Sequence, residues 1–365
     1  MNDELDRILD AAQDWLARDL DFALATVVGV RGSTYRGLAA RQLVGADGQS
    51  VGTVSGGCLD QDLQREAAEV IRLDRPRVVE FDLTADDEAV WGWGIGCNGA
   101  TRLVVEPPSS VARLVEQVRR TPRPFVLVHH LEGDRLGERT VVRPGEEGPY
   151  AEIAEQAINE GWHRVTEAAG EQVMVEVVGA PRRLVVCGAG HDAAPVVRFG
   201  AELGYEVWVV DDRRPFLSEQ RFPEAAQLVQ VRPAELSRAV DLSPATSVVI
   251  MTHNYLRDLD YLDQCLGRRL AYIGVLGPGE RLERLLSDLA ERGRHPDDHD
   301  RAVLHGPAGL DIGAEGPVEI AWSIMSEILA VRRGKQGGFL RNRKGPAGLR
   351  GYDPTTSRAT GELST

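Results

Sequence analysis

The stretch that most constrains the fold of this chain is "RLVVCGAGHDAAPVV", residues 183–197, where an apolar run gives way to closely spaced glycines and then to a helical pattern. Gly188, Gly190 and Ala193 form a Gly-x-Gly-x-x-Ala turn between the expected strand and helix. This turn is typical of parallel sheets whose strands alternate with helices. The alternation continues to about residue 276, so we expect a Rossmann-like, doubly wound α/β domain.

The same turn and the acid that follows it favour a nucleotide ligand. Gly188 allows the tight turn, Gly190 lets the backbone approach a pyrophosphate at the helix N-terminus, and Ala193 allows close packing of helix on strand. His191 lies inside the turn and faces a ligand there, or simply caps the helix. Asp211, 21 residues after Gly190, ends the next strand and could accept hydrogen bonds from ribose hydroxyls, which favours NAD or another nucleotide with a 2′-hydroxyl over NADP. The alternative is a sheet that keeps the turn without a ligand.

A histidine follows a later strand of this domain. His253 lies in "TSVVIMTHNYLRDL", just past the apolar run, and ligands of such sheets bind at the carboxyl ends of the strands. We consider two roles for His253: a functional acid, base or ligand, or a residue that caps the next helix or bonds to the backbone.

The first half of the chain has a different pattern, that of a mixed α+β domain. Apolar, β-branched runs at 22–30, 77–83, 101–107, 124–133 and 139–144 predict strands, and residues 109–120 predict a helix. Asp47-Gly48 between two short apolar runs predicts a hairpin. We therefore predict an N-terminal domain over 1–170, a Rossmann-like domain over 181–334, and a basic, glycine-rich, disordered tail over 335–365.

Composition excludes several classes of function. The formal net charge of −14 argues against broad nucleic-acid binding, which requires a basic face for phosphates. No apolar run approaches the ~20 residues that cross a bilayer, so we expect no membrane association. Four cysteines in 365 residues do not form a disulfide framework, and the N-terminus resembles an amphipathic helix instead of a signal peptide. We expect a soluble protein of the cytoplasm.

Two of the cysteines lie in glycine-rich turns. Cys58 stands in "SGGCLD", between a strand-like run and a helical one, and Cys97 stands in "GIGCNG". A thiol near a helix N-terminus favours its thiolate form, which is a soft-metal ligand, a sulfur carrier or a nucleophile. Cys187 and Cys265 fall in an apolar strand and a helix, where packing explains them. No histidine or Cys-x-x-C cluster surrounds Cys58 or Cys97, which argues against a closed zinc site.

Six motifs, taken in order, resemble the XdhC/CoxI family of accessory proteins for molybdenum hydroxylases. They are "VRGSTYRGLAARQLVGADGQSVGTVSGGCLDQDL", "GIGCNGATRLVVEP", "LVVCGAGHDAAPV", "VVIMTHNYLRDLDYL", "YIGVLGPGERLERL" and "GLDIGAEGPVEIAWSIMSEILAVR". The resemblance covers about residues 20–333. It implies a maturation factor that binds the molybdenum cofactor, supports its sulfuration by a cysteine desulfurase, and passes it to the apoenzyme of a hydroxylase such as xanthine dehydrogenase.

The resemblance also implies which residues contact the cofactor. Ser55, Gly56, Gly57 and Cys58 match the family's signature turn, and Cys97 matches its second glycine–cysteine turn. Cys58 would be the principal molybdenum contact, with Cys97 as a second contact or a disulfide partner, and the turn amides would bind the pterin phosphate. Arg41 would be available to the same phosphate.

Two other functions remain open at this point. One is an NAD-dependent oxidoreductase in which His253 donates or accepts the proton. The other is a non-catalytic interaction scaffold whose nucleotide turn has lost its ligand. For the maturation factor we expect a homodimer, the commonest form of oligomer.

Overall fold

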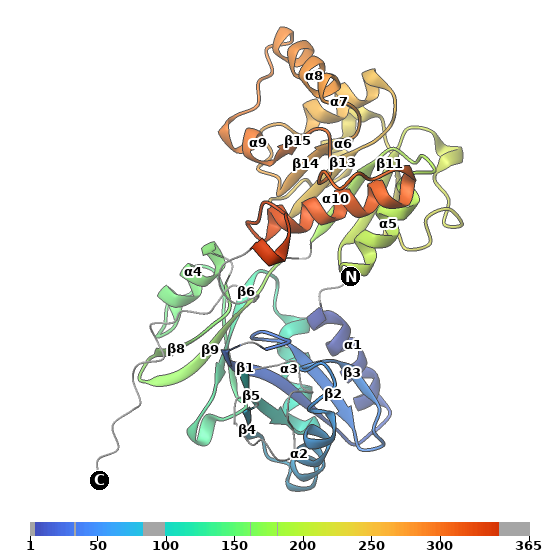
Figure 1. The fold of residues 1–365 in the computed structure, drawn as a ribbon. Helices are drawn as coiled ribbons and strands as arrows, with labels where there is room; N and C mark the ends of the chain where they lie inside the picture. The colour runs from blue at the N-terminus through green and yellow to red at the C-terminus, as the bar shows by residue number, and fades with distance from the viewer. Residues whose placement is uncertain (1–3, 33, 83–98, 161, 181, 343–365) are drawn as a thin grey trace. The chain divides into compact units, whose positions relative to one another are not determined.

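The computed structural model describes residues 4–342 except residues 33, 83–98, 161 and 181 (Figure 1). These residues form two compact units, 4–180 and 181–342, and each unit has hydrophobic clusters of its own. Residues 335–342, within the predicted tail, include a short 3-10 helix at Leu340–Asn342. In the described part of the chain, no helix is both long enough and apolar enough to span a bilayer.

The first unit contains an antiparallel sheet of five strands in the order β3-β2-β1-β5-β4. The hairpin predicted at Asp47-Gly48 is present and joins β2 to β3, with Gly48 at a φ of 87°. Alternate side chains of β1 point to opposite faces, as a pleated strand requires. The strands are β1 (Phe22–Gly32), β2 (Arg41–Gly45), β3 (Ser50–Gly52), β4 (Arg77–Asp82) and β5 (Gly99–Glu106).

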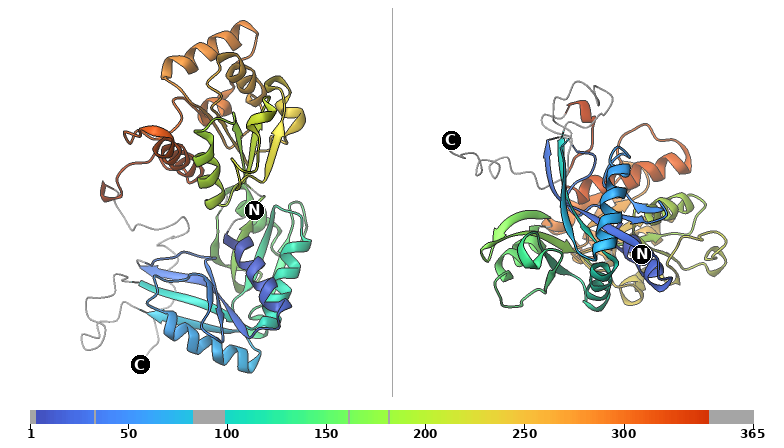
Figure 2. Two further views of the ribbon diagram at one scale, coloured as in Figure 1. Left: turned by 90° about the vertical axis from the view of Figure 1, so that its right-hand side faces the viewer. Right: turned by 90° about the horizontal axis from the view of Figure 1, so that it is seen from below.

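Helices cover both faces of this sheet (Figures 1 and 2). Phe22 and Leu24 of β1 pack with α1 and α3, whereas Ala23 and Ala25 pack with α2. The helix predicted at 109–120 is α3. The three helices are α1 (Glu4–Ala17), α2 (Asp60–Leu73) and α3 (Pro108–Arg120).

A second antiparallel sheet completes the unit, in the order β7-β6-β9-β8. Helix α4 (Ala151–Glu160) packs on one face of it through Ala154 and Ala157. The other face meets the first sheet, where Val28 and Val104 pack against Met174. The strands are β6 (Phe125–His130), β7 (Arg139–Val142), β8 (Arg164–Ala168) and β9 (Glu171–Val178).

The second unit confirms the predicted Rossmann-like fold. Its six strands are all parallel and lie in the order β12-β11-β10-β13-β14-β15, the doubly wound arrangement in which the direction of winding reverses between β10 and β13. The strands are β10 (Arg183–Cys187), β11 (Glu206–Asp211), β12 (Gln227–Gln230), β13 (Thr246–Ile250), β14 (Tyr272–Val275) and β15 (Leu304–His305).

Helices lie on both faces of the parallel sheet, as its continuous apolar strands require (Figure 1). Leu262 of α7 and Leu285 of α8 pack on one face, and Val197 of α5 and Ile324 of α10 pack on the other. The helices are α5 (Ala193–Glu202), α6 (Leu236–Ala239), α7 (Tyr255–Cys265), α8 (Gly279–Glu291), α9 (Asp298–Val303) and α10 (Gly316–Arg332).

Candidate functional site

In the first unit, the Ser55-Gly56-Gly57-Cys58 turn connects β3 to α2. The hydroxyl of Ser55, which is 5% exposed, accepts hydrogen bonds from the amides of Gly57 at 3.1 Å and Leu59 at 3.5 Å. Gly57 has a φ of 100°, which side chains other than glycine rarely adopt. The helix begins at Asp60, so Cys58 lies two residues before it. The buried hydroxyl of Ser55 therefore stabilises the conformation of the turn.

This turn presents several groups to solvent. Cys58 is an exposed free thiol. Among the described residues, nothing accepts a hydrogen bond from the amides of Gly56 and Cys58. The amide of Gly57, by contrast, is already used by Ser55. The turn thus combines a soft sulfur ligand with two free N–H donors, a combination that suits a soft metal carried by an anionic ligand.

An aromatic ring that sequence reasoning missed lies beside the turn. A Cβ built on Gly56 would lie 3.8 Å from the ring of Tyr35, and Tyr35 is 64% exposed. An exposed ring of this kind can stack on a planar heterocycle. The signal in the sequence was a tyrosine between polar residues and glycines in "GSTYRG", which has no apolar period to explain it.

The second glycine–cysteine turn is only partly within the described residues. Cys97 lies outside them, whereas Gly99 begins β5 and pairs with Gly32 at the end of β1. Tyr35 follows Gly32 by three residues, and its ring lies 3.8 Å from where a Cβ on Gly56 would stand. The start of β5, just after Cys97, therefore lies at the same end of the first sheet as the end of β1, from which the chain continues to Tyr35 and the Cys58 turn.

Arg41 does not serve as predicted, because the structure places it in the interior. It is 2% exposed, and its two terminal nitrogens lie 2.8 and 2.5 Å from the two carboxylate oxygens of Glu176. Its remaining hydrogen bond goes to the carbonyl of Ala39. A guanidinium that is buried and paired in this way is not available to a phosphate in solvent.

The Arg41 pair belongs to a buried polar network between the two sheets of this unit. His129 lies 2.7 Å from Glu176 through Nε2 and accepts a hydrogen bond from Arg139 at Nδ1, so it is neutral with its proton on Nε2. Burial lowers the pKa of His129 to about 4. Burial opposes ionisation of Glu176, but Arg41 and His129 hold its pKa well below the usual value. Arg139 also pairs with Glu106 of β5.

In the second unit, the predicted glycine turn lies where the winding reverses, between β10 and β13. The amide of Gly188 donates to the carbonyl of Val210 at 2.8 Å, and its φ is 115°. A Cβ at this position would lie 2.8 Å from the carbonyl oxygen of Met251. The close approach of two chain segments therefore requires glycine at 188. Ala193 is fully buried at the start of α5.

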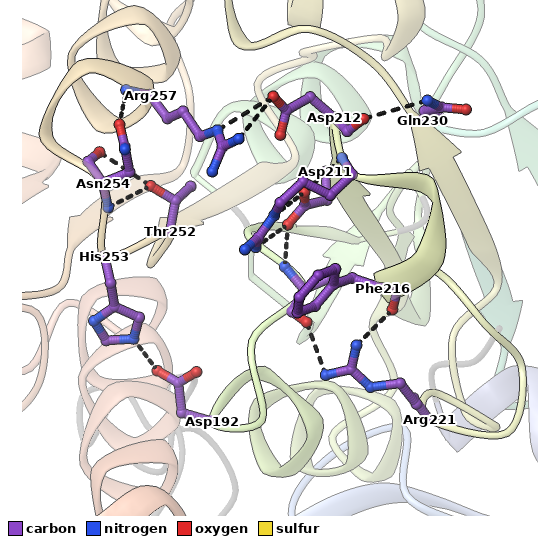
Figure 3. Close-up of polar contacts among 12 residues, drawn as sticks. Asp192, Asp211, Asp212, Phe216, Arg221, Gln230, Thr252, His253, Asn254 and Arg257 are labelled. Atoms are coloured by element: carbon purple, nitrogen blue, oxygen red, sulfur yellow. Dashed lines mark hydrogen bonds and ion pairs between the residues drawn. The ribbon is translucent and has the colours of Figure 1, made fainter.

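Asp211 lies at the end of β11, as predicted, but its carboxylate has internal partners (Figure 3). One oxygen accepts the amide of Ala189 at 2.7 Å, and Arg213 donates to both oxygens at 2.9 and 2.8 Å. Burial raises the pKa of Asp211, but these hydrogen bonds outweigh it and lower the pKa to about 2. A ribose would have to share this carboxylate with Arg213.

His253 points toward the start of α5 (Figure 3). Its Nε2 lies 2.7 Å from a carboxylate oxygen of Asp192, and its backbone has a φ of 56°. The residue that caps α7 is Asn254, whose side chain accepts the amide of Arg257. His191, within the glycine turn, is exposed.

The remaining cysteines are packing residues. Cys187 and Cys265 are fully buried, and burial raises the pKa of both thiols, that of Cys265 to about 12. Over the part of the chain that the structure describes, no three His, Cys, Asp or Glu side chains are grouped to hold a metal ion. Cys58 is thus the exposed thiol among the three described cysteines.

Two family models match this sequence. Residues 15–82 match the XdhC and CoxI family, and residues 184–328 match the XdhC Rossmann domain. The first range contains Cys58, and the second contains the glycine turn and His253.

Known proteins similar to this chain match it along most of its length. A protein of Bacillus subtilis named as a probable xanthine dehydrogenase subunit is 30% identical, covering 88% of this chain and 96% of its own. The molybdenum cofactor insertion chaperone PaoD of Escherichia coli is 23% identical, covering 91% of this chain and 90% of its own. A crystal structure described as a xanthine dehydrogenase from Bacillus halodurans has a TM-score of 0.72 and 30% identity, covering 91% of this chain and 98% of its own.

Proposed function

This chain belongs to the XdhC and CoxI family, and on that premise we propose that it binds the molybdenum cofactor and delivers it to a molybdenum hydroxylase. The name of the PaoD relative, an insertion chaperone for this cofactor, supports the proposal. The name of the Bacillus subtilis relative supports a hydroxylase of the xanthine dehydrogenase type as the recipient.

The observation that carries this proposal is the exposed turn around Cys58. The molybdenum of the cofactor is bound by soft dithiolene sulfurs, so an open coordination position suits the Cys58 thiolate. The phosphate of the pterin suits the free amides of Gly56 and Cys58, and Tyr35 offers a face for the planar pterin. Three different chemical groups of the cargo thus each have a matching group within one short stretch of surface.

The finer parts of the proposal concern sulfur and partners. We propose that Cys97 provides a second contact to the cofactor, and that a cysteine desulfurase acts on the bound cofactor before transfer. We also propose that the protein works in the cytoplasm, since its three described cysteines are free thiols. The homodimer remains a proposal that rests on the frequency of this assembly among oligomers.

The order of the parallel strands favours a second candidate function, an oxidoreductase that binds NAD at the glycine turn and uses His253 as acid or base. Against it stand the internal partners of Asp211 and the pairing of His253 with Asp192. Consumption of reduced nicotinamide with a small carbonyl compound would favour this enzyme over the carrier.

The proposal is tested by transfer of the cofactor in vitro. Wild-type protein loaded with molybdenum cofactor should restore activity to a purified apo-hydroxylase, and Cys58→Ala treated in the same way should restore little. Cys265→Ala, which removes a buried thiol, is the control and should behave as wild type. Equal restoration by Cys58→Ala and wild type would exclude Cys58 as the cofactor contact.

A further inference from the structure

A carboxylate lies beside the place where a nucleotide phosphate would be expected in the second unit. In doubly wound sheets, a pyrophosphate binds at the N-terminus of the helix that follows the glycine turn, here α5. Among the described residues, nothing accepts a hydrogen bond from the amides of Gly190, His191 and Asp192. These free donors and the positive end of the helix dipole favour a negative charge at this point.

Asp192, directly before α5, places its carboxylate beside this turn. Oδ1 of Asp192 lies within contact distance of the space that a Cβ on Gly190 would occupy. Glycine at this position of the turn leaves room for a pyrophosphate to approach the backbone. The carboxylate therefore fills room that the glycine provides.

His253 pairs with Asp192 in this position. Its Nε2 lies 2.7 Å from Oδ2 of Asp192 (Figure 3). The two oxygens of the carboxylate have different surroundings, since Oδ1 lies against the space that a Cβ on Gly190 would occupy. His253 follows β13 and Asp192 follows β10, the two strands between which the winding reverses. The pair thus bridges the crevice that binds nucleotides in sheets of this order.

We propose that Asp192 is an internal block to a phosphate: its carboxylate fills the room beside Gly190 that a pyrophosphate needs, its pair with His253 keeps it there, and a pyrophosphate-bearing nucleotide must displace it. This inference is independent of molybdenum cofactor binding in the first unit. Two like charges in close contact repel each other, and they do so more strongly in a partly buried site than in water. Asp192 therefore lowers the affinity for nucleotide phosphates without affecting a nucleoside.

The Asp192→Asn variant tests this proposal without disturbing the helix. Asparagine has the same shape as aspartate and is as good a residue at the start of a helix, so the protein should fold normally. Binding of ADP and of adenosine to the full-length protein would be measured by isothermal titration calorimetry. We expect ADP to bind Asp192→Asn about tenfold more tightly than wild type, and adenosine to bind both equally.

Two further variants make the test specific. Asp263→Asn on α7 removes one negative charge that is paired with Arg294, and it should leave the affinity for ADP unchanged. His253→Asn, a residue type that tolerates a positive φ, should release Asp192 and strengthen ADP binding by a smaller factor of about threefold. If Asp192→Asn bound ADP no more tightly than wild type, or if His253→Asn bound it more weakly, the proposal would be wrong.

Discussion

At the scale of single residues, Ser55 determines the shape of the turn that carries Cys58. Its buried hydroxyl accepts the amides of Gly57 and Leu59, and no other acceptor for these amides lies in the described residues. Ser55→Ala should therefore lower the free energy of unfolding by about 1 kcal/mol and weaken cofactor binding. Urea denaturation measures the first effect. Ser109→Ala, which removes an exposed hydroxyl, should cause neither.

His129 gives the first unit a dependence on pH. Its pKa is about 4 in the folded protein, below its ordinary value of 6.5, so folding favours the neutral form. The contribution of neutral His129 to the free energy of unfolding is complete above pH 6.5 and is lost as the pH falls toward 4. Between pH 7 and 4.5 the loss should be about 2 to 3 kcal/mol. The low pKa of Glu176 adds its own loss below its ordinary value of 4.5.

Variants at two histidines separate this effect from a general response to acid. His129→Gln should flatten the dependence of the free energy of unfolding on pH between 6.5 and 4.5. His191→Gln, at an exposed position, should leave that dependence as in wild type. An unchanged slope in His129→Gln would show that other groups are responsible.

Individual residues were predictable only where their role depends on nearby sequence. Gly188 acts through turn geometry, which the local pattern contains, whereas the hydrogen bond from the amide of Gly57 to Ser55 was not predicted. The predicted role of Arg41 as a phosphate ligand was wrong, because its partner Glu176 lies 135 residues away in the sequence. Nothing in the local sequence shows that an arginine will be buried by a distant strand.

At the scale of elements, Gly188 determines how closely β10 and β13 approach at their carboxyl ends. Gly188→Ala would add a Cβ 2.8 Å from the carbonyl oxygen of Met251 and would strain a backbone at a φ of 115°. We expect a loss of about 2 to 4 kcal/mol in the free energy of unfolding. Gly179→Ala is the matched control, since no atom lies within 4 Å of its added Cβ. Equal stability of both variants would contradict the assigned role.

Secondary structure was predictable because its signals are periodic. The β-branched runs became β1, β4, β5, β6 and β7, and the alternation of strands with helices became the parallel sheet. The pairing of the first unit into two sheets was not predictable, since pairing depends on contacts between residues far apart in the chain. For the same reason the sequence could not show that Tyr35 lies against Gly56.

At the scale of the whole molecule, the protein carries a net charge of −14 and two units with separate cores. Because the protein is acidic overall, an anionic cofactor has to be bound by local groups. In the first unit, the groups suited to this are the free amides of Gly56 and Cys58. In the second unit, the Asp192 carboxylate lies beside Gly190 of the Rossmann crevice and pairs with His253. We therefore propose that carriage of the cofactor is a property of the first unit.

The most direct test of this account is the molybdenum and pterin content of the protein. Wild type, Cys58→Ala and the control Cys265→Ala would be isolated without oxygen from a host that makes the cofactor. The account predicts near-stoichiometric molybdenum and pterin in wild type and in Cys265→Ala, and their loss in Cys58→Ala. Equal cofactor content in Cys58→Ala and wild type, or no cofactor in any of the three, would contradict it.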